Sequence, residues 1–238
     1  MVDFSEITPE YIASVDLRTI IQTPVVIEGK SIDDLMTSYE QLFVAAYILA
    51  YNTIVRSDAK NPYEIAIDWL RTTDFYTAPA STQYHDSVPG GLLTHSLRVY
   101  NELIELIKIP AFKSVQLEHA VISALVHDWC KIGLYEMYER NVKNEKTGQW
   151  EKVPSYRYNQ RGIPLGHGAT SMYIAMKMIP LTVEQALAIR WHMGRWDVCQ
   201  PEYSELQKSN AEYPLVYLLQ FADQLACTEY SNRIESNQ

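Results

Sequence analysis

Apolar residues recur at helical spacing along most of the chain, and this pattern predicts an all-α fold. A helix is expected from Ser31, because this serine can cap it and aspartates occupy its first turn. Further helices are expected near Pro62, Thr182 and Pro214, where a capping residue or a proline precedes apolar residues at helical spacing. The mostly apolar run at 120–126 predicts a buried helix.

Two stretches depart from this pattern. Residues 1–30 have little helical periodicity, and the β-branched residues at 24–29 favour an extended arm. Residues 140–160 place aromatic and β-branched residues on both sides of a turn-like segment that ends at Gly148, which predicts a small inserted β-hairpin. We expect one compact unit, in which residues 1–74 pack on a domain of residues 75–230 and residues 231–238 form a frayed tail.

Polar residues interrupt the apolar faces at a few positions. His127 and Asp128 directly follow the buried run, where a carboxylate beside an imidazole is costly unless a cation compensates it. Lys131 follows three residues after Asp128, which on a helix places its ammonium over the same face. The other inward-pointing residues lie on separate predicted helices or helix starts and are His95, His167, His192 and Asp223. Any one of these histidines could be an ordinary core residue, but together they predict a metal site.

Composition limits the classes of function. The 238 residues carry a formal net charge of -9, which disfavours a protein that holds long nucleic acid on a basic surface. The three cysteines show no C-x-x-C spacing and are expected to be free thiols in a reducing compartment. The apolar run at 42–51 is too short to span a bilayer, and the acidic N-terminus lacks a signal pattern. A cytoplasmic protein without a membrane partner is expected.

The order of these residues (H, then H-D, then H, H and D) resembles the HD-domain superfamily of metal-dependent phosphohydrolases. The resemblance covers about residues 75–230 and implies an HD-domain helical bundle, here with the hairpin inserted and an N-terminal helical extension. His85 and Asp86 form a second H-D pair, but this pair lies in a polar connector without an apolar run before it or a lysine after it. We therefore exclude it as the metal-binding pair.

The resemblance implies two divalent metal ions that share Asp128. The first would be held by His95, His127, Asp128 and Asp223, and the second by Asp128, His167 and His192. Imidazole and carboxylate ligands suit Mn, Fe, Co, Ni or Zn, whereas Mg is expected at one site at most. Lys131 matches the lysine of the family's H-D-x-x-K form, where it would contact a phosphate oxygen.

The function implied by the resemblance is cleavage of a phosphoester of a nucleotide or a small nucleotide-like substrate by a metal-bound hydroxide, with Asp128 and Lys131 as catalytic residues. His85, Arg190 and Arg195 are candidate substrate contacts, and packing explains the two arginines equally well. Short single-stranded nucleic acid is a substrate disfavoured by the net charge, and a homodimer is left open. The alternatives are an HD-type di-iron oxygenase and a nucleotide-binding HD protein without turnover.

Overall fold

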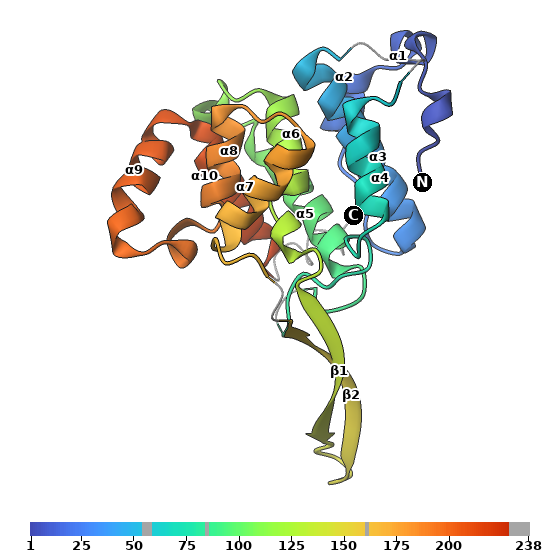
Figure 1. The fold of residues 1–238 in the computed structure, drawn as a ribbon, viewed down its shortest axis with the longest axis vertical. Helices are drawn as coiled ribbons and strands as arrows, with labels where there is room; N and C mark the ends of the chain where they lie inside the picture. The colour runs from blue at the N-terminus through green and yellow to red at the C-terminus, as the bar shows by residue number, and fades with distance from the viewer. Residues whose placement is uncertain (54–58, 84–85, 160–161, 229–238) are drawn as a thin grey trace.

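The computed structural model describes residues 1–53, 59–83, 86–159 and 162–228, and Figure 1 shows a helical body from which a hairpin projects. The helices are α1 (Pro9–Ser14), α2 (Leu17–Gln22), α3 (Ile32–Tyr51), α4 (Pro62–Arg71), α5 (Gly91–Leu106), α6 (Leu117–Val126), α7 (His167–Met178), α8 (Val183–Trp191), α9 (Tyr203–Glu212) and α10 (Pro214–Ala226). The strands are β1 (Tyr135–Lys143) and β2 (Trp150–Tyr158), and the 3-10 turns are η1 (Phe4–Glu6), η2 (Pro110–Phe112), η3 (Trp129–Lys131), η4 (Gly194–Asp197) and η5 (Gln200–Glu202). The prediction of a mainly helical fold with a small hairpin is confirmed.

Helix α6 lies at the centre of the helical body. Every residue from Ala120 to Val126 is buried, because α3, α5 and α8 all pack against this helix. Helix α5 in turn packs against α10. Two side chains fix α3 on the core: the Tyr39 hydroxyl donates to the Leu125 carbonyl oxygen at 2.8 Å, and the Trp129 indole donates to that hydroxyl at 3.2 Å. Residues that follow α6 directly therefore start from the interior of the protein.

Local capping sets the start of two helices as the sequence predicts. Ser31 accepts from the backbone N–H of Asp34, whose side chain accepts from the backbone of Ser31. Thr182 and Gln185 form the same reciprocal pair at the start of α8. Each capping box satisfies backbone donors that the first helical turn leaves without partners.

The N-terminal segment is more helical than its weak periodicity suggests. It forms the short helices α1 and α2, capped by the side chains of Thr8 and Asp16. Residues 24–27, within the expected extended arm, form neither helix nor strand, and residues 28–29 lie in a turn. The Asn101 side chain on α5 instead bonds both the N–H and the carbonyl oxygen of Val25, at 2.8 and 2.9 Å. One amide side chain thus takes the place of a partner strand.

A buried ion pair ties the N-terminus to α3 and α4. Glu40 is fully buried, and its carboxylate accepts two hydrogen bonds from the Arg71 guanidinium, at 2.7 and 2.9 Å. The same carboxylate accepts from the backbone N–H of Val2 at 2.7 Å. Arg71 side chain exposure is 22%, so this pair is largely shielded from water.

The hairpin is longer than the predicted range of 140–160. Strands β1 and β2 pair antiparallel from Tyr135 opposite Tyr158 to Lys143 opposite Trp150. Figure 1 shows the ribbon extending away from the helices. Its root lies against the body, while its far end has no helix beside it. Within the described parts of the chain, no helix is both long and apolar enough to cross a membrane.

Candidate metal centre

Two histidines occupy equivalent positions at the ends of buried helices. His127 is the C-cap of α6 and His192 the C-cap of α8. The Nδ1 atom of each ring lies 2.7 Å from a carbonyl oxygen three residues earlier, on Ala124 and Ile189. Because a carbonyl oxygen only accepts, each Nδ1 carries the proton, and in the neutral ring Nε2 presents its lone pair.

The structure brings all six predicted ligand positions together. His95 comes from α5, His167 is the first residue of α7, and Asp223 lies on α10. Asp128 follows His127 immediately, so the end of α6 supplies two of the side chains. Apart from His167, whose side chain is 25% exposed, these side chains are buried.

Asp128 lies between two pairs of imidazoles. Its Oδ1 atom is 2.7 Å from Nε2 of His167 and 3.6 Å from Nε2 of His192. Its Oδ2 atom is 3.4 Å from Nε2 of His95 and also 3.4 Å from Nε2 of His127. The two oxygens of one carboxylate therefore face two separate histidine pairs.

Asp223 completes one half of the cluster. Its Oδ1 atom lies 3.1 Å from Nε2 of His95 and 3.8 Å from Nε2 of His127. These two ring nitrogens are themselves only 3.3 Å apart. This half thus combines two imidazoles with one oxygen from each of two carboxylates.

The cluster has the chemistry of a metal site. His192 Nε2 is buried and has no hydrogen-bond partner among the described residues. Lone pairs of imidazoles and carboxylates that converge without water repel one another unless a cation lies among them. Overlapping groups could hold a metal ion, including His95 with His127 and Asp128, and Asp128 with His167 and His192. The donor set therefore fits the metal ions that the sequence predicts.

Protons partly compensate the carboxylates when no metal is bound. Burial lowers the pKa of His95, but its hydrogen bonds to Asp128 and Asp223 outweigh burial and raise the pKa to about 9. Burial opposes ionisation of both carboxyl groups, yet Lys131 beside Asp128 and His95 beside Asp223 hold their pKa values below the usual range. The centre is thus built to keep both carboxylates ionised.

Lys131 lies against the shared carboxylate. Its Nζ atom is 2.6 Å from Asp128 Oδ2, and its side chain is 10% exposed. Burial lowers the pKa of Lys131, but Asp128 outweighs burial and the net shift is upward, so the side chain is an ammonium. The sequence predicts this pairing from helical spacing, whereas α6 ends at Val126 and the 3-10 turn η3 makes the contact. The spacing of three residues survives because a 3-10 turn also aligns residues three apart.

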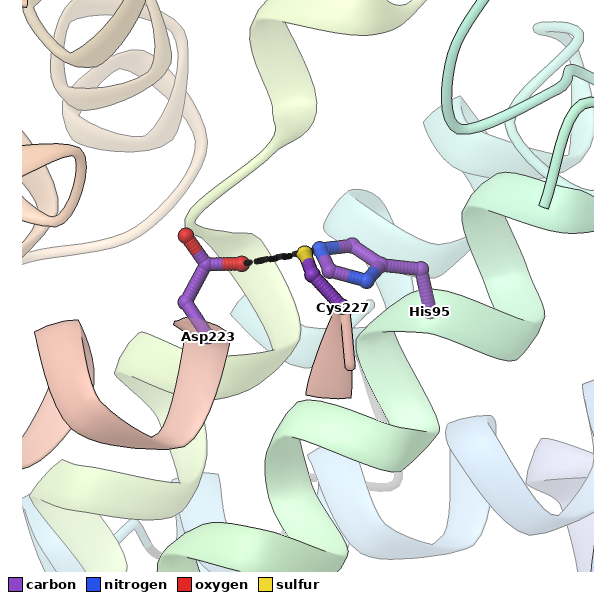
Figure 2. A group of neighbouring side chains, drawn as sticks. All are labelled: His95, Asp223 and Cys227. Carbon is purple, nitrogen blue, oxygen red and sulfur yellow. Dashed lines mark hydrogen bonds and ion pairs between the residues drawn. The ribbon is translucent and has the colours of Figure 1, made fainter. Parts of the chain in front are cut away.

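Two cysteines adjoin the cluster, and neither is predicted as a site residue from the sequence. Figure 2 shows His95, Asp223 and Cys227 turned toward one another, with Cys227 Sγ 3.9 Å from Asp223 Oδ1. Cys130 Sγ lies 3.3 Å from Nδ1 of His167. The spacing of four between Asp223 and Cys227 is the sequence feature that could have revealed the first contact. Burial and the charge of Asp223 raise the pKa of the Cys227 thiol.

A cavity of about 890 Å³ opens onto the cluster. The cluster residues that line it are His95, Asp128, His167, His192 and Asp223, and Lys131 lines it beside them. Its wall also includes Tyr135 and Tyr158 from the root of the hairpin and Trp196 from η4. The metal-type cluster is therefore accessible to a small molecule, and aromatic side chains surround the approach.

Arg190 and Arg195, two of the three candidate substrate contacts, have partners near α8. Arg190 pairs with Glu202 at 2.8 Å and with Asp197 at 3.4 Å, and the Arg195 guanidinium lies over the Tyr203 ring. Neither arginine is among the described residues that line the cavity. Carboxylates and an aromatic ring near α8 engage both guanidinium groups, as the packing alternative expects, and contact of either arginine with a substrate stays a prediction. His85 falls outside the described residues.

Arg190 has a supporting position instead. Its partner Asp197 accepts hydrogen bonds from the backbone N–H groups of His167 and Gly168, at 3.3 and 2.9 Å. This carboxylate stabilises the positive N-terminal end of α7, which carries His167. Arg190 therefore helps to position Asp197, and Asp197 caps α7, the helix that carries the candidate ligand His167.

No protein-family model, curated protein or solved structure matches this chain. The cluster is a set of histidines and aspartates, all but His167 buried, on α5, α7 and α10 and at the ends of α6 and α8, that could hold a metal ion.

Proposed function

We propose that the protein is a metal-dependent phosphohydrolase of the HD type, which cleaves a phosphoester of a nucleotide or a small nucleotide-like substrate. One observation carries the proposal: the two oxygens of Asp128 face two different pairs of histidines. A carboxylate in this position can serve two metal ions at once. The order of the ligand residues along the chain also resembles the HD pattern.

The proposed ligand sets follow the two halves of the cluster. His95, His127, Asp128 and Asp223 would hold one ion, and Asp128, His167 and His192 the other. Nitrogen and oxygen donors together suit Mn, Fe, Co, Ni or Zn, with Mg less suited. When bound, such ions supply Lewis acidity toward a phosphoryl group and lower the pKa of water.

The protein's own groups prepare the site for this chemistry. The bonds from Nδ1 of His127 and His192 to backbone carbonyl oxygens fix the ring orientation and keep Nε2 directed into the cluster. Burial keeps bulk water away, which strengthens every electrostatic interaction inside. Asp128 is held ionised by Lys131, so it is ready to act as a ligand without losing a proton.

Lys131 is the proposed contact for a phosphate oxygen. Its ammonium lines the cavity beside Asp128, and metal ions on Asp128 would weaken its pull on this ammonium. Lys131 is then available to a non-bridging or leaving oxygen, where a fixed positive charge stabilises the transition state. The cavity of about 890 Å³ supports a substrate of nucleotide size.

The proposal is tested by loading the protein with Mn²⁺ and incubating it with nucleoside mono- and triphosphates, cyclic mono- and dinucleotides and short single-stranded RNA. Mass spectrometry of the products identifies the bond that is cut. We expect a dephosphorylated or linearised product from one class, and we expect Asp128→Asn to lose both metal content and turnover. Asp33→Asn is the matched control, because Asp33 is an exposed aspartate on α3, outside the cavity.

Other outcomes would contradict the proposal. Full metal content and turnover in Asp128→Asn would refute the proposal that Asp128 is a ligand shared by two metal ions. Metal in the wild-type sample without any product would refute the hydrolase. Iron binding with O₂ consumption would then indicate the oxygenase alternative, and saturable nucleotide binding without product would indicate a binding protein.

A further inference from the structure

Three aromatic side chains line the cavity beside the metal-type cluster, and they come from segments far apart in the chain. Tyr135 begins β1 and Tyr158 ends β2, so the first residue pair of the hairpin register contributes both. Trp196 comes from η4, which follows α8. The hairpin root and the segment after His192 thus contribute to the same wall.

Two of these rings, those of Trp196 and Tyr158, are too exposed to be part of the protein core. Trp196 is 86% exposed and Tyr158 is 64% exposed, although both border a cavity. An exposed tryptophan leaves a large apolar surface in water at a cost in free energy, and this cost is offset when a ligand covers the ring. Such side chains beside a polar centre are typical of sites that bind a molecule with a flat apolar group.

The hairpin root holds its part of this wall in a defined position. The Tyr135 and Tyr158 rings are 5.3 Å apart and tilted by 50°, and the Tyr135 hydroxyl reaches the Ala80 carbonyl oxygen at 3.5 Å. Cross-strand pairing fixes the register at this end of the ribbon. Tyr158 is therefore positioned by the sheet and by Tyr135, without help from a ligand.

The cavity combines two kinds of surface. The cluster and the Lys131 ammonium supply charged groups, whereas the three aromatic residues supply flat apolar faces. A ligand that uses both must carry an anionic group and a planar ring in one molecule.

We propose that Trp196, Tyr158 and Tyr135 form a subsite that stacks the planar base of a nucleoside phosphate while its phosphate lies at the metal centre. This inference rests on the proposed function for the position of the phosphate. The root of the hairpin is then part of the substrate site. Stacking tolerates any base because every base has a flat face, so the subsite selects for the presence of a base.

The test compares adenosine 5′-monophosphate with ribose 5-phosphate, which differ in the presence of the base. Their 5′-methylene phosphonate analogues, in which a P–C bond replaces the P–O bond that would be cut, would be titrated calorimetrically into the manganese-loaded full chain. We expect the adenosine analogue to bind about tenfold more tightly, and Trp196→Ala to bring this ratio close to one. Tyr158→Phe keeps a ring and should retain the ratio, whereas Tyr158→Ala should lower it.

Trp150→Ala is the matched control, because Trp150 is also an exposed tryptophan, 69% exposed, but lies at the far end of the hairpin. This variant should bind both ligands as the wild type does. Equal affinity of the wild type for the two ligands would overturn the inference. An equal loss in Trp150→Ala and Trp196→Ala would also overturn it.

Phosphate release from adenosine 5′-monophosphate and from ribose 5-phosphate, measured with the manganese-loaded protein, separates this inference from the proposed function. Phosphate release from both at equal kcat/KM would support the proposed hydrolase and refute the base subsite. A tenfold preference in binding without release from either would support the subsite and refute the hydrolase.

Discussion

Gly168 links the packing of α7 on α8 to the geometry of the metal centre. A Cβ atom at this position would lie 2.1 Å from the carbonyl oxygen of Arg190 and 3.0 Å from that of Ile189. Carbon and oxygen atoms in ordinary contact are about 3.3 Å apart or more, so Gly168→Ala must separate the two helices by roughly 1 Å. Overpacking of this kind costs about 1–3 kcal/mol of unfolding free energy.

The separation of α7 from α8 would also displace a candidate metal ligand. His167 precedes Gly168, and its Nε2 atom lies only 2.7 Å from Asp128 Oδ1. A displacement of roughly 1 Å misplaces this imidazole, and errors of that size reduce turnover by about a hundredfold. With two ions bound as proposed, we expect Gly168→Ala to keep the ion of the His95 half and to lose the other.

The assays are urea denaturation, metal content by mass spectrometry after dialysis, and phosphate release. Gly148→Ala is the control, because Gly148 has a φ of +71° in the hairpin turn but nothing within 4 Å of the added Cβ. It tests backbone strain alone, so its metal content should match the wild type. A folded Gly168→Ala protein with unchanged stability and two ions would refute the argument.

Two further predictions concern the ion pair and the cysteine. Arg71→Ala leaves the carboxylate of Glu40 buried with fewer partners and should lower the free energy of unfolding by about 3 kcal/mol, the lower end of the range for buried pairs because Arg71 is 22% exposed. Lys108→Ala breaks a pair of similar length, 2.6 Å, whose lysine is 64% exposed, and should cost less than about 0.5 kcal/mol in the same urea titration; equal losses would contradict the role of burial. Cd²⁺ should give an ultraviolet sulfur-to-metal charge-transfer band, since Cys227 Sγ lies within 4.8 Å of ligand atoms of His95 and Asp223. Because Cys130 also adjoins the cluster, the comparison is made in a Cys130→Ser background. There Cys227→Ser should remove the band and Cys199→Ser should not, so a band that persists without Cys227 would exclude it as a ligand.

Local interactions are what the sequence predicts best. The capping box of Ser31 joins groups three residues apart, so its formation does not depend on the rest of the fold. The apolar run at 120–126 requires burial wherever the chain places it, and so the buried position of His127 and Asp128 follows from the run before them. The pairing of Lys131 with Asp128 is local in the same sense.

Long-range packing decides what the sequence leaves open. The short helices α1 and α2 lack strong periodicity, and isolated helices of their length are unstable, so they depend on contacts such as those of α2 with α3. Arg190 and Arg195 look like substrate contacts in the sequence, but carboxylates and a ring brought near by the fold engage them. The extra length of the hairpin likewise depends on its root meeting the body at Tyr135.

The sequence by itself determined which side chains can bind a metal and that apolar surroundings force them inward, because residue type and periodicity are local properties. Only the tertiary structure decided that the two oxygens of Asp128 face separate histidine pairs, because that arrangement needs α5, α7 and α8 to meet at the end of α6. It also decided that Cys227 joins the cluster and that Trp196 and Tyr158 share one cavity. Cys227 and His95, like Trp196 and Tyr158, come from segments far apart in the sequence, so only chain packing brings them together.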